Sequence, residues 1–332
     1  MGRRQRKSIL SSVSLEASLP QESAGVRLET ALLNGNLKSI APIPHGTART
    51  QVLAVAFLSA LSIAFWWHPL TATLRLALAD DAYTHILLIL PLSGALIYMD
   101  SRAVRVNPQL SLRIGAAVLV TAAAIGCYAR WGMVATPELV RVSLGMAGLV
   151  LWWIASVVLC FGMSTFRSFL FPLCFLFLVV PLPEFALSRV VEFLQDQSAV
   201  AARLMFSAAG VPATQDGIIV SIPGLDIEVA QECSSIRSSL MLVVTTMVLA
   251  HLFLRSWWRK ALLIAAAIPL SVAKNGFRIF TIAELGTRVD PGFLTGRLHH
   301  HGGILFFGVS VFAMGVLLWA MRRTELPTAK GS

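Results

Sequence analysis

Charged side chains are scarce in this 332-residue chain, in which Asp, Glu, Lys and Arg together make up only 13%. Soluble domains contain about a quarter of such residues. Hydrophobic residues make up 56% instead, and most of them are gathered in long runs. This combination excludes an ordinary soluble domain and is typical of a protein that crosses a membrane several times.

Cysteine is scarce as well, and four cysteines at scattered positions are too few for a disulfide framework. Cys127, Cys160 and Cys174 lie inside apolar runs, where we expect each to pack as a small hydrophobic side chain. Cys233 has polar neighbours in the stretch "IEVAQECSSIRSSLML" (227–242), at the start of another apolar run. Cys233 is therefore the cysteine to consider for chemistry.

The chain also lacks a repeat, a targeting signal and a basic patch. We find no internal repeat, no low-complexity tract and no secretory signal, because the first apolar run begins only near Gln51. The net charge of +10 does not indicate a nucleic-acid partner, since the basic residues lie between apolar runs and form no patch with aromatic residues. Residues 1–49 are polar and basic, and they predict a largely disordered cytoplasmic tail.

Apolar runs follow the tail, and each approaches the roughly 20 residues needed to cross the hydrocarbon of a bilayer. The sequence therefore predicts an all-α polytopic membrane protein with about eight transmembrane helices, in a domain over residues 50–322 that precedes a cytoplasmic tail over 323–332. Tryptophan pairs at 66–67, 152–153 and 257–258 predict anchors at the membrane interface. The runs lie at about residues 51–67, 84–99, 114–131, 142–163, 168–183, 235–254, 260–281 and 302–321.

Positive charge is distributed unevenly between the connections. If the first tail is cytoplasmic, most of the 27 Lys and Arg residues fall on the cytoplasmic side, which predicts a cell inner or plasma membrane protein with both termini cytoplasmic. Residues 184–234 then form the longest extracytoplasmic segment, in which apolar residues first recur at helical spacing and then alternate with polar ones. We expect a short amphipathic helix on or near the membrane surface, followed by a β-hairpin that leads to Cys233.

Three polar clusters reach the outer ends of the last three predicted helices. They comprise Cys233 before the sixth helix, Lys274, Asn275 and Arg278 near the end of the seventh, and His299, His300 and His301 before the eighth. The N-terminus of a helix and a nearby cation both lower the pKa of a thiol and so favour the thiolate, which is the nucleophilic form. Arg237 lies four residues after Cys233 and therefore shares its helix face. A histidine can carry the proton to a leaving amine, and an arginine can stabilise an oxyanion. The clusters therefore indicate nucleophilic catalysis.

Each cluster also has a simpler interpretation. Cys233 could be a palmitoylation site, the histidines could bind a metal, and Arg278 could pair with Glu284 or with a lipid phosphate. No cysteine or carboxylate is spaced to complete a zinc set, so we expect neither a metal nor another cofactor. A second class of function stays open: a non-enzymatic transporter or lipid-binding assembly partner that holds an anionic group with Lys274, Arg278 and the histidines.

The three clusters, in this order, resemble the exosortase/archaeosortase family of membrane cysteine transpeptidases. The stretch "CSSIRSS" (233–239) resembles the family's Cys-Ser-Gly-Ile-Arg-Ser motif, with Ser235 where glycine is common. The stretch "NGFR" (275–278) resembles its Asn-x-x-Arg motif, and "HHHGGILFF" (299–307) resembles its late histidine before a glycine-rich helix start. The early "DAYTHILLILPL" (81–92) is similar to its Asp-x-x-Tyr-Ser-His stretch.

The resemblance covers roughly residues 50–322 and implies an extracytoplasmic thiol protease and transpeptidase. Its substrates would be exported proteins with PEP-CTERM-like sorting tails, made of a short motif, one membrane helix and a basic end. Cys233 would cut near the motif and form a thioester, which an amine-bearing acceptor or water would then release. The implied catalytic residues are Cys233, Arg278 and His300, and His299 is the alternative catalytic histidine. Possible supporting residues are Arg237, Asn275 and Lys274.

Overall fold

The computed structural model describes residues 45–103, 111–132, 135–229, 236–295 and 303–325. The chain divides into two compact units, Met1–Val52 and Leu53–Ser332, and the second holds nearly all of the described elements. The predicted tails over residues 1–49 and 323–332 lie largely outside the described residues. The disorder expected of the first tail therefore stays a prediction.

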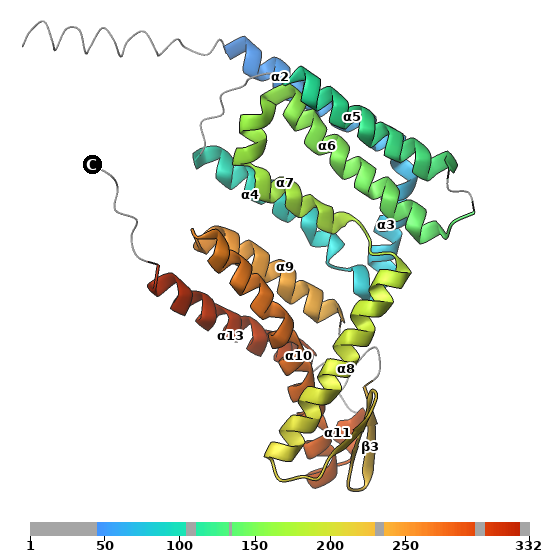
Figure 1. The fold of residues 1–332 in the computed structure, drawn as a ribbon, viewed down its shortest axis with the longest axis vertical. Coiled ribbons are helices and arrows are strands. Elements are labelled where there is room, and N and C mark those ends of the chain that lie inside the picture. Colours follow the sequence, from blue (N-terminus) through green and yellow to red (C-terminus); the bar gives the residue numbers. More distant parts are fainter. Residues whose placement is uncertain (1–44, 104–110, 133–134, 230–235, 296–302, 326–332) are drawn as a thin grey trace, which may run out of the picture. The chain divides into compact units, whose positions relative to one another are not determined.

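Helices dominate the part of the chain that the structure describes (Figure 1). Six of the described helices are long and apolar enough to cross a membrane, and the number rises to eight if each of two bent helix pairs forms one span. The prediction of an all-α polytopic membrane protein is confirmed.

The helices before the sheet are α2 (His45–Phe65), α3 (Trp67–Ala79), η1 (Asp81–Tyr83), α4 (Ile86–Ala103), α5 (Leu112–Cys127), the π turn η2 (Tyr128–Gly132), α6 (Glu138–Ser168), α7 (Leu170–Phe175), η3 (Leu176–Val179) and α8 (Glu184–Ala208). After the sheet come α9 (Ile236–Phe253), α10 (Trp257–Arg288), α11 (Gly292–Thr295) and α13 (Gly303–Arg323).

Two of the predicted spans are bent. α2 and α3 meet at 76°, where Trp66 leaves the helical conformation. The run predicted over 168–183 contains only the short α7 and η3, which meet α8 at 96°. Pro181 and Pro183 lie in this second bend, and prolines end helices because they lack a backbone N–H and restrict the preceding residue.

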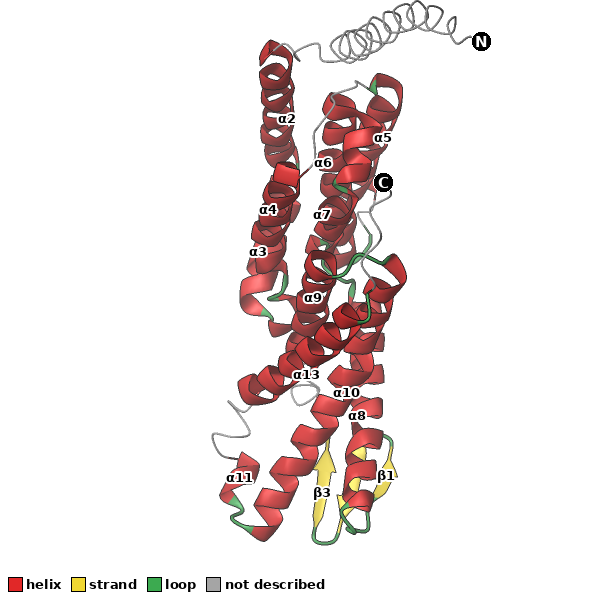
Figure 2. Ribbon diagram, turned by 90° about the vertical axis from the view of Figure 1, so that its left-hand side faces the viewer, coloured by secondary structure: helices red, strands yellow, loops and turns green. Residues whose placement is uncertain are grey.

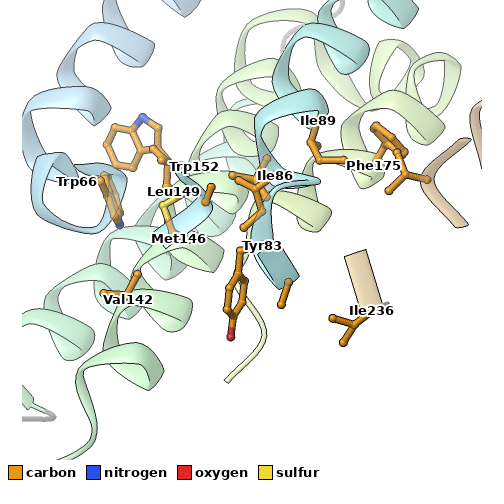
Figure 3. Close-up of a cluster of buried hydrophobic side chains, with 14 of the residues drawn as sticks. Trp66, Tyr83, Ile86, Ile89, Val142, Met146, Leu149, Trp152, Phe175 and Ile236 are labelled. Atoms are coloured by element: carbon orange, nitrogen blue, oxygen red, sulfur yellow. The ribbon is translucent and has the colours of Figure 1, made fainter. Parts of the chain in front are cut away.

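The largest buried cluster joins the first half of the chain to the start of α9 (Figure 3). It contains Leu149 of α6, Tyr83 of η1 and Ile236, the first residue of α9. In a membrane protein, close packing of such side chains between helices stabilises the fold. The core therefore fixes the point at which α9 begins, three residues after Cys233.

The tryptophan pair at 152–153 is not an interfacial anchor, so that prediction is wrong. Trp152 is 8% exposed, and its indole N–H donates a hydrogen bond to the carbonyl of Leu58 at 3.0 Å. The indole N–H of Trp153 donates to the hydroxyl of Ser62 at 2.9 Å. Both tryptophans lie in the middle of the 31-residue α6, where a buried indole N–H needs a protein partner and finds one on α2.

A small antiparallel sheet follows α8, and it consists of β1 (Thr214–Asp216), β2 (Ile219–Ile222) and β3 (Leu225–Glu228) in that order. The predicted hairpin corresponds to β2 and β3, which turn at Gly224 with a positive φ of 84°. A further turn at Gly217, with a φ of 56°, adds β1 to the sheet. The pair Asp216-Gly217 is a typical hairpin signal, and it explains the third strand.

α8 packs along the second half of α10, and the sheet lies beside the ends of both helices (Figure 1 and Figure 2). Phe206 of α8, Val220 of β2 and Ile279 of α10 belong to one buried cluster. The amphipathic pattern of α8 is therefore explained by its contacts with α10 and the sheet. Its predicted position on or near the membrane surface stays a prediction.

Replacing Gly276 with Ala is expected to lower the free energy of unfolding by about 1–3 kcal/mol, because the closest contact between α8 and α10 would be overpacked. The added Cβ would lie 2.6 Å from the Cβ of Ala201, and both atoms are attached directly to packed backbones. Gly308→Ala on α13 is the matched control, since its Cβ would meet no atom within 4 Å. Thermal unfolding in one detergent measures the difference, and equal unfolding temperatures would contradict this packing.

Candidate active site

A buried polar face lies on the second half of α10. Lys274, Asn275 and Arg278 are only 7%, 0% and 8% exposed. Lys274 and Arg278 are four residues apart and Ser271 lies three residues before Lys274, so these side chains project from one side of the helix. Two buried cations one turn apart make this face strongly positive.

The first turn of α9 packs against this polar face. The ammonium group of Lys274 donates a hydrogen bond to the hydroxyl of Ser238, and the hydroxyl of Ser271 donates one to that of Ser239. Only residues 254–256 connect α9 to α10, and the two helices run antiparallel. Ser238 and Ser239 of α9 therefore face the polar side of α10.

Arg237 has a different partner. Its guanidinium lies 2.7 Å from a carboxylate oxygen of Asp81, and the two side chains are 55% and 76% exposed. An ion pair this exposed contributes little to stability. It nevertheless links η1 to the first turn of α9, so the early stretch at 81–92 reaches the candidate site.

Two further side chains of the early stretch are buried. The hydroxyl of Tyr83 donates a hydrogen bond to the carbonyl of Leu182 at 2.8 Å, and Nδ1 of His85 lies 3.1 Å from the carbonyl of Ala82. The contact of Tyr83 holds η1 against the loop that precedes α8, whereas the contact of His85 is local. Reasoning from the sequence missed both residues as parts of the site, and the only available signal was the resemblance of 81–92 to an early family motif.

Two acidic side chains near this part of the molecule form ion pairs with cations other than Lys274 and Arg278. Glu284 of α10 forms an ion pair with Arg288 at 2.7 Å, and Asp81 pairs with Arg237. Within the described ranges, no three His, Cys, Asp or Glu side chains gather as a metal ion would require. The cationic side chains of the described polar face are Lys274 and Arg278, and such side chains bind anionic groups.

Cys233 lies outside the described residues, but the chain on both sides of it is fixed. Val229 is fully buried, its amide donates to the carbonyl of Ile218 at 2.9 Å, and its carbonyl accepts from the side-chain amide of Gln195 at 2.9 Å. On the other side, Ile236 is buried at the start of α9. The sheet, α8 and the core therefore hold both ends of the segment that carries the cysteine.

The adjacent histidines at 299–301 also lie outside the described residues. They precede α13, whose first turn contacts α10: the ring of Phe306 packs edge-on against that of Phe277, with centroids 5.9 Å apart. Phe277 is the chain neighbour of Arg278. The starts of α9 and α13 therefore both contact α10 within about two turns of Arg278.

The three other cysteines do not share one environment. Cys160 is buried, Cys127 is half-buried and Cys174 is exposed on α7. The expectation that each packs as a small hydrophobic side chain fits the buried Cys160, whereas Cys174 is exposed. An apolar membrane helix turns some side chains toward lipid, which is as apolar as the protein interior.

The comparisons with known proteins identify the family of this chain. A family model described as transmembrane exosortase matches residues 66–316, which is more than half of the chain. Neither the comparison with curated proteins nor the comparison with solved structures gives a match. The matched residues include η1, α9, α10 and the first part of α13, so they span every element that approaches the polar face. This chain belongs to the transmembrane exosortase family.

Proposed function

We propose that this chain is a membrane cysteine protease and transpeptidase that cleaves the C-terminal sorting tails of exported proteins. Family membership supports a membrane enzyme of the sorting-signal type. The observation that carries the finer proposal is the convergence of the first turns of α9 and α13 on the buried cationic face of α10. The segments before these two turns carry Cys233 and the histidines.

The register between α9 and α10 supports pairing Cys233 with Arg278. In antiparallel helices of equal rise, each turn further along one helix lies level with one turn earlier in the other. Lys274 contacts Ser238, so Arg278, one turn further along α10, lies about one turn beyond the level of Ser238, towards the start of α9. Cys233 comes five residues before Ser238.

Each proposed residue has a defined chemical role. The thiolate of Cys233 attacks the scissile carbonyl, and Arg278 stabilises the resulting oxyanion with a charge that it cannot lose. His300 donates a proton to the leaving amine, which collapses the intermediate to a thioester. An amine-bearing acceptor or water then attacks the thioester, gives its proton to His300 and releases the thiolate.

Arg278 is a better candidate for the oxyanion stabiliser than Arg237. Arg278 is 8% exposed, and a charge in such an environment acts on a nearby oxyanion more strongly than one in water. Arg237 is half-exposed and engaged by Asp81. We assign Arg237 and Asp81 to the positioning of α9 against η1, with Lys274 and Asn275 supporting the face that carries Arg278.

The length of α10 supports a site at the membrane boundary. Its 32 residues extend over about 48 Å, whereas the hydrocarbon of a bilayer is about 30 Å thick. Trp257 and Trp258 are exposed at its start, and exposed tryptophan side chains are typical of a membrane–water interface. About 20 residues later the helix reaches the opposite boundary, close to Lys274 and Arg278. A substrate with one membrane helix would meet the enzyme at this level.

Cysteine labelling tests the proposed orientation, in which this boundary is extracytoplasmic and both termini are cytoplasmic. In a variant whose four native cysteines are replaced by alanine, Asp226→Cys is expected to react in intact cells with a membrane-impermeant maleimide, and Arg255→Cys is expected to stay unlabelled. Both positions are exposed, so protein packing blocks neither reaction. Permeabilised cells give the matched control, in which both positions should react. The reverse pattern in intact cells would contradict the orientation.

The function itself is tested with a tailed reporter. An exported protein that ends in a short motif, one membrane helix and a basic end from the same genome is expected to be shortened in cells that make this chain. Cells without the chain should keep the tail on the reporter. Unchanged reporters for every such tail in the genome would contradict the proposed activity.

A further inference from the structure

A cavity lies at the bend between α2 and α3, where α5 ends in the π turn η2 and α6 begins. Its volume is about 270 Å³, and its polar lining residues are Trp66, His68, Arg130, Glu138 and Arg141. None of these residues takes part in the proposed cleavage. A π turn is an uncommon element that often marks a functional site.

Two nitrogen atoms in this lining are buried without a hydrogen-bond partner. Trp66 is 2% exposed and its indole Nε1 has no partner, and the same is true of the buried Nε of Arg141. Figure 3 shows the indole nitrogen of Trp66 on the side of Val142, which also lines the cavity. A buried donor without an acceptor costs about 1–3 kcal/mol, so this lining is suited to an acceptor that enters from outside.

The lining also has a surplus of positive charge. Among the described residues, no carboxylate lies within ion-pair distance of Arg130 or Arg141. The guanidinium of Arg130 lies 5.4 Å from the ring centre of Trp131, which orients it at the rim. Glu138 is the one acidic residue of the lining, so two guanidinium groups face a single carboxylate. An anion is the ligand that this set favours.

The surroundings place the cavity at the level of lipid headgroups. Trp67, Tyr128 and Trp131 are 62%, 59% and 61% exposed close to its rim. Exposed tryptophan and tyrosine side chains are typical of the membrane–water interface, where lipid phosphates also lie. The anion that is most concentrated at this level is therefore a lipid phosphate.

We propose that this cavity binds a phosphate group, as carried by a phospholipid headgroup at the membrane interface. Arg130 and Arg141 pair with the phosphate oxygens, which guanidinium groups match in geometry and charge. The indole N–H of Trp66 donates a further hydrogen bond. A cavity of about 270 Å³ accommodates the phosphate and part of the headgroup, and the acyl chains stay along the helices.

Native mass spectrometry of the purified full-length chain tests this proposal. Phosphatidylglycerol is expected to stay bound at least about tenfold more strongly than a diacylglycerol with the same acyl chains, because the diacylglycerol lacks only the phosphate-containing headgroup. The double variant Arg130→Gln/Arg141→Gln should lose this preference. Trp66→Phe, which removes the N–H and keeps an aromatic ring, should weaken phosphatidylglycerol binding by a smaller factor.

The matched control is Arg75→Gln/Arg113→Gln, which removes the same charge from exposed positions on α3 and α5 outside the lining. This control should keep the preference, and unfolding temperatures without lipid verify that both double variants are folded. Adding millimolar inorganic phosphate shows whether the cavity binds free phosphate or a phospholipid headgroup. Competition with phosphatidylglycerol indicates a site for free phosphate, and absence of competition indicates a headgroup site. Equal phosphatidylglycerol binding by the two double variants would overturn the proposal.

Discussion

Cys233→Ala is expected to abolish processing of the tailed reporter, with a loss of at least about 10⁴-fold in rate, because no other group can form the thioester. Cys233→Ser should fail to nearly the same extent, since a serine hydroxyl is far less acidic than a thiol and the proposed mechanism starts from a thiolate. The measurement is the ratio of processed to unprocessed reporter at matched expression of the enzyme.

The control for this prediction is the triple variant Cys127→Ala/Cys160→Ala/Cys174→Ala. It removes every other thiol and is expected to keep most of the activity, because none of these side chains lies on the polar face of α10. Only Cys160 is buried, so the cost in stability is limited to one small packing defect. Processing that survived Cys233→Ala but not the triple change would move the nucleophile to another cysteine.

Arg278→Lys is expected to lower the turnover of the reporter by about 10²–10³, the usual cost of losing one oxyanion donor. Lysine keeps the positive charge but replaces a rigid fork of donors with a single ammonium group on a flexible chain. A residue that only balances charge would tolerate this change. The effect is therefore expected in the rate of processing and not in the amount of inserted protein.

The matched control is Arg288→Lys, an equivalent change on the same helix ten residues further along. Arg288 is 63% exposed and pairs with Glu284, so lysine should replace it without loss of activity. Unfolding temperatures of both variants in one detergent separate a damaged fold from a damaged site. Near-normal processing by Arg278→Lys would remove Arg278 from the mechanism and make Arg237 the next candidate.

The helical architecture could be predicted because membrane crossing depends on local sequence. A run of about 20 apolar residues satisfies its own backbone hydrogen bonds as a helix, whatever its neighbours are. The bend at Trp66 was missed because a run of apolar residues carries no information about helix direction, whereas Pro181 and Pro183 were a signal for the second bend. The contacts of the buried Trp152 and the half-buried Trp153 were missed for a related reason, since their partners Leu58 and Ser62 lie on another helix.

The candidate site could be predicted in part. The sequence identified Lys274, Asn275 and Arg278, and the structure gathers them on a buried face beside the first turn of α9. The contact of Asp81 with Arg237 joins residues 156 positions apart, and no local pattern encodes such a pairing. Cys233, His299 and His300 lie outside the described residues, so their roles stay predictions that rest on the motifs and on the fixed helix starts around them.

The most direct test of the account asks whether the cleaved product passes through a thioester on Cys233. Hydroxylamine intercepts thioesters, so the product formed in its presence should end in a hydroxamic acid, which mass spectrometry distinguishes from a free carboxylate. The account predicts hydroxamate at the new C-terminus with the wild-type enzyme and no product of either kind with Cys233→Ala. A product that ends only in a carboxylate, formed at a rate that hydroxylamine does not change, would contradict the thioester mechanism.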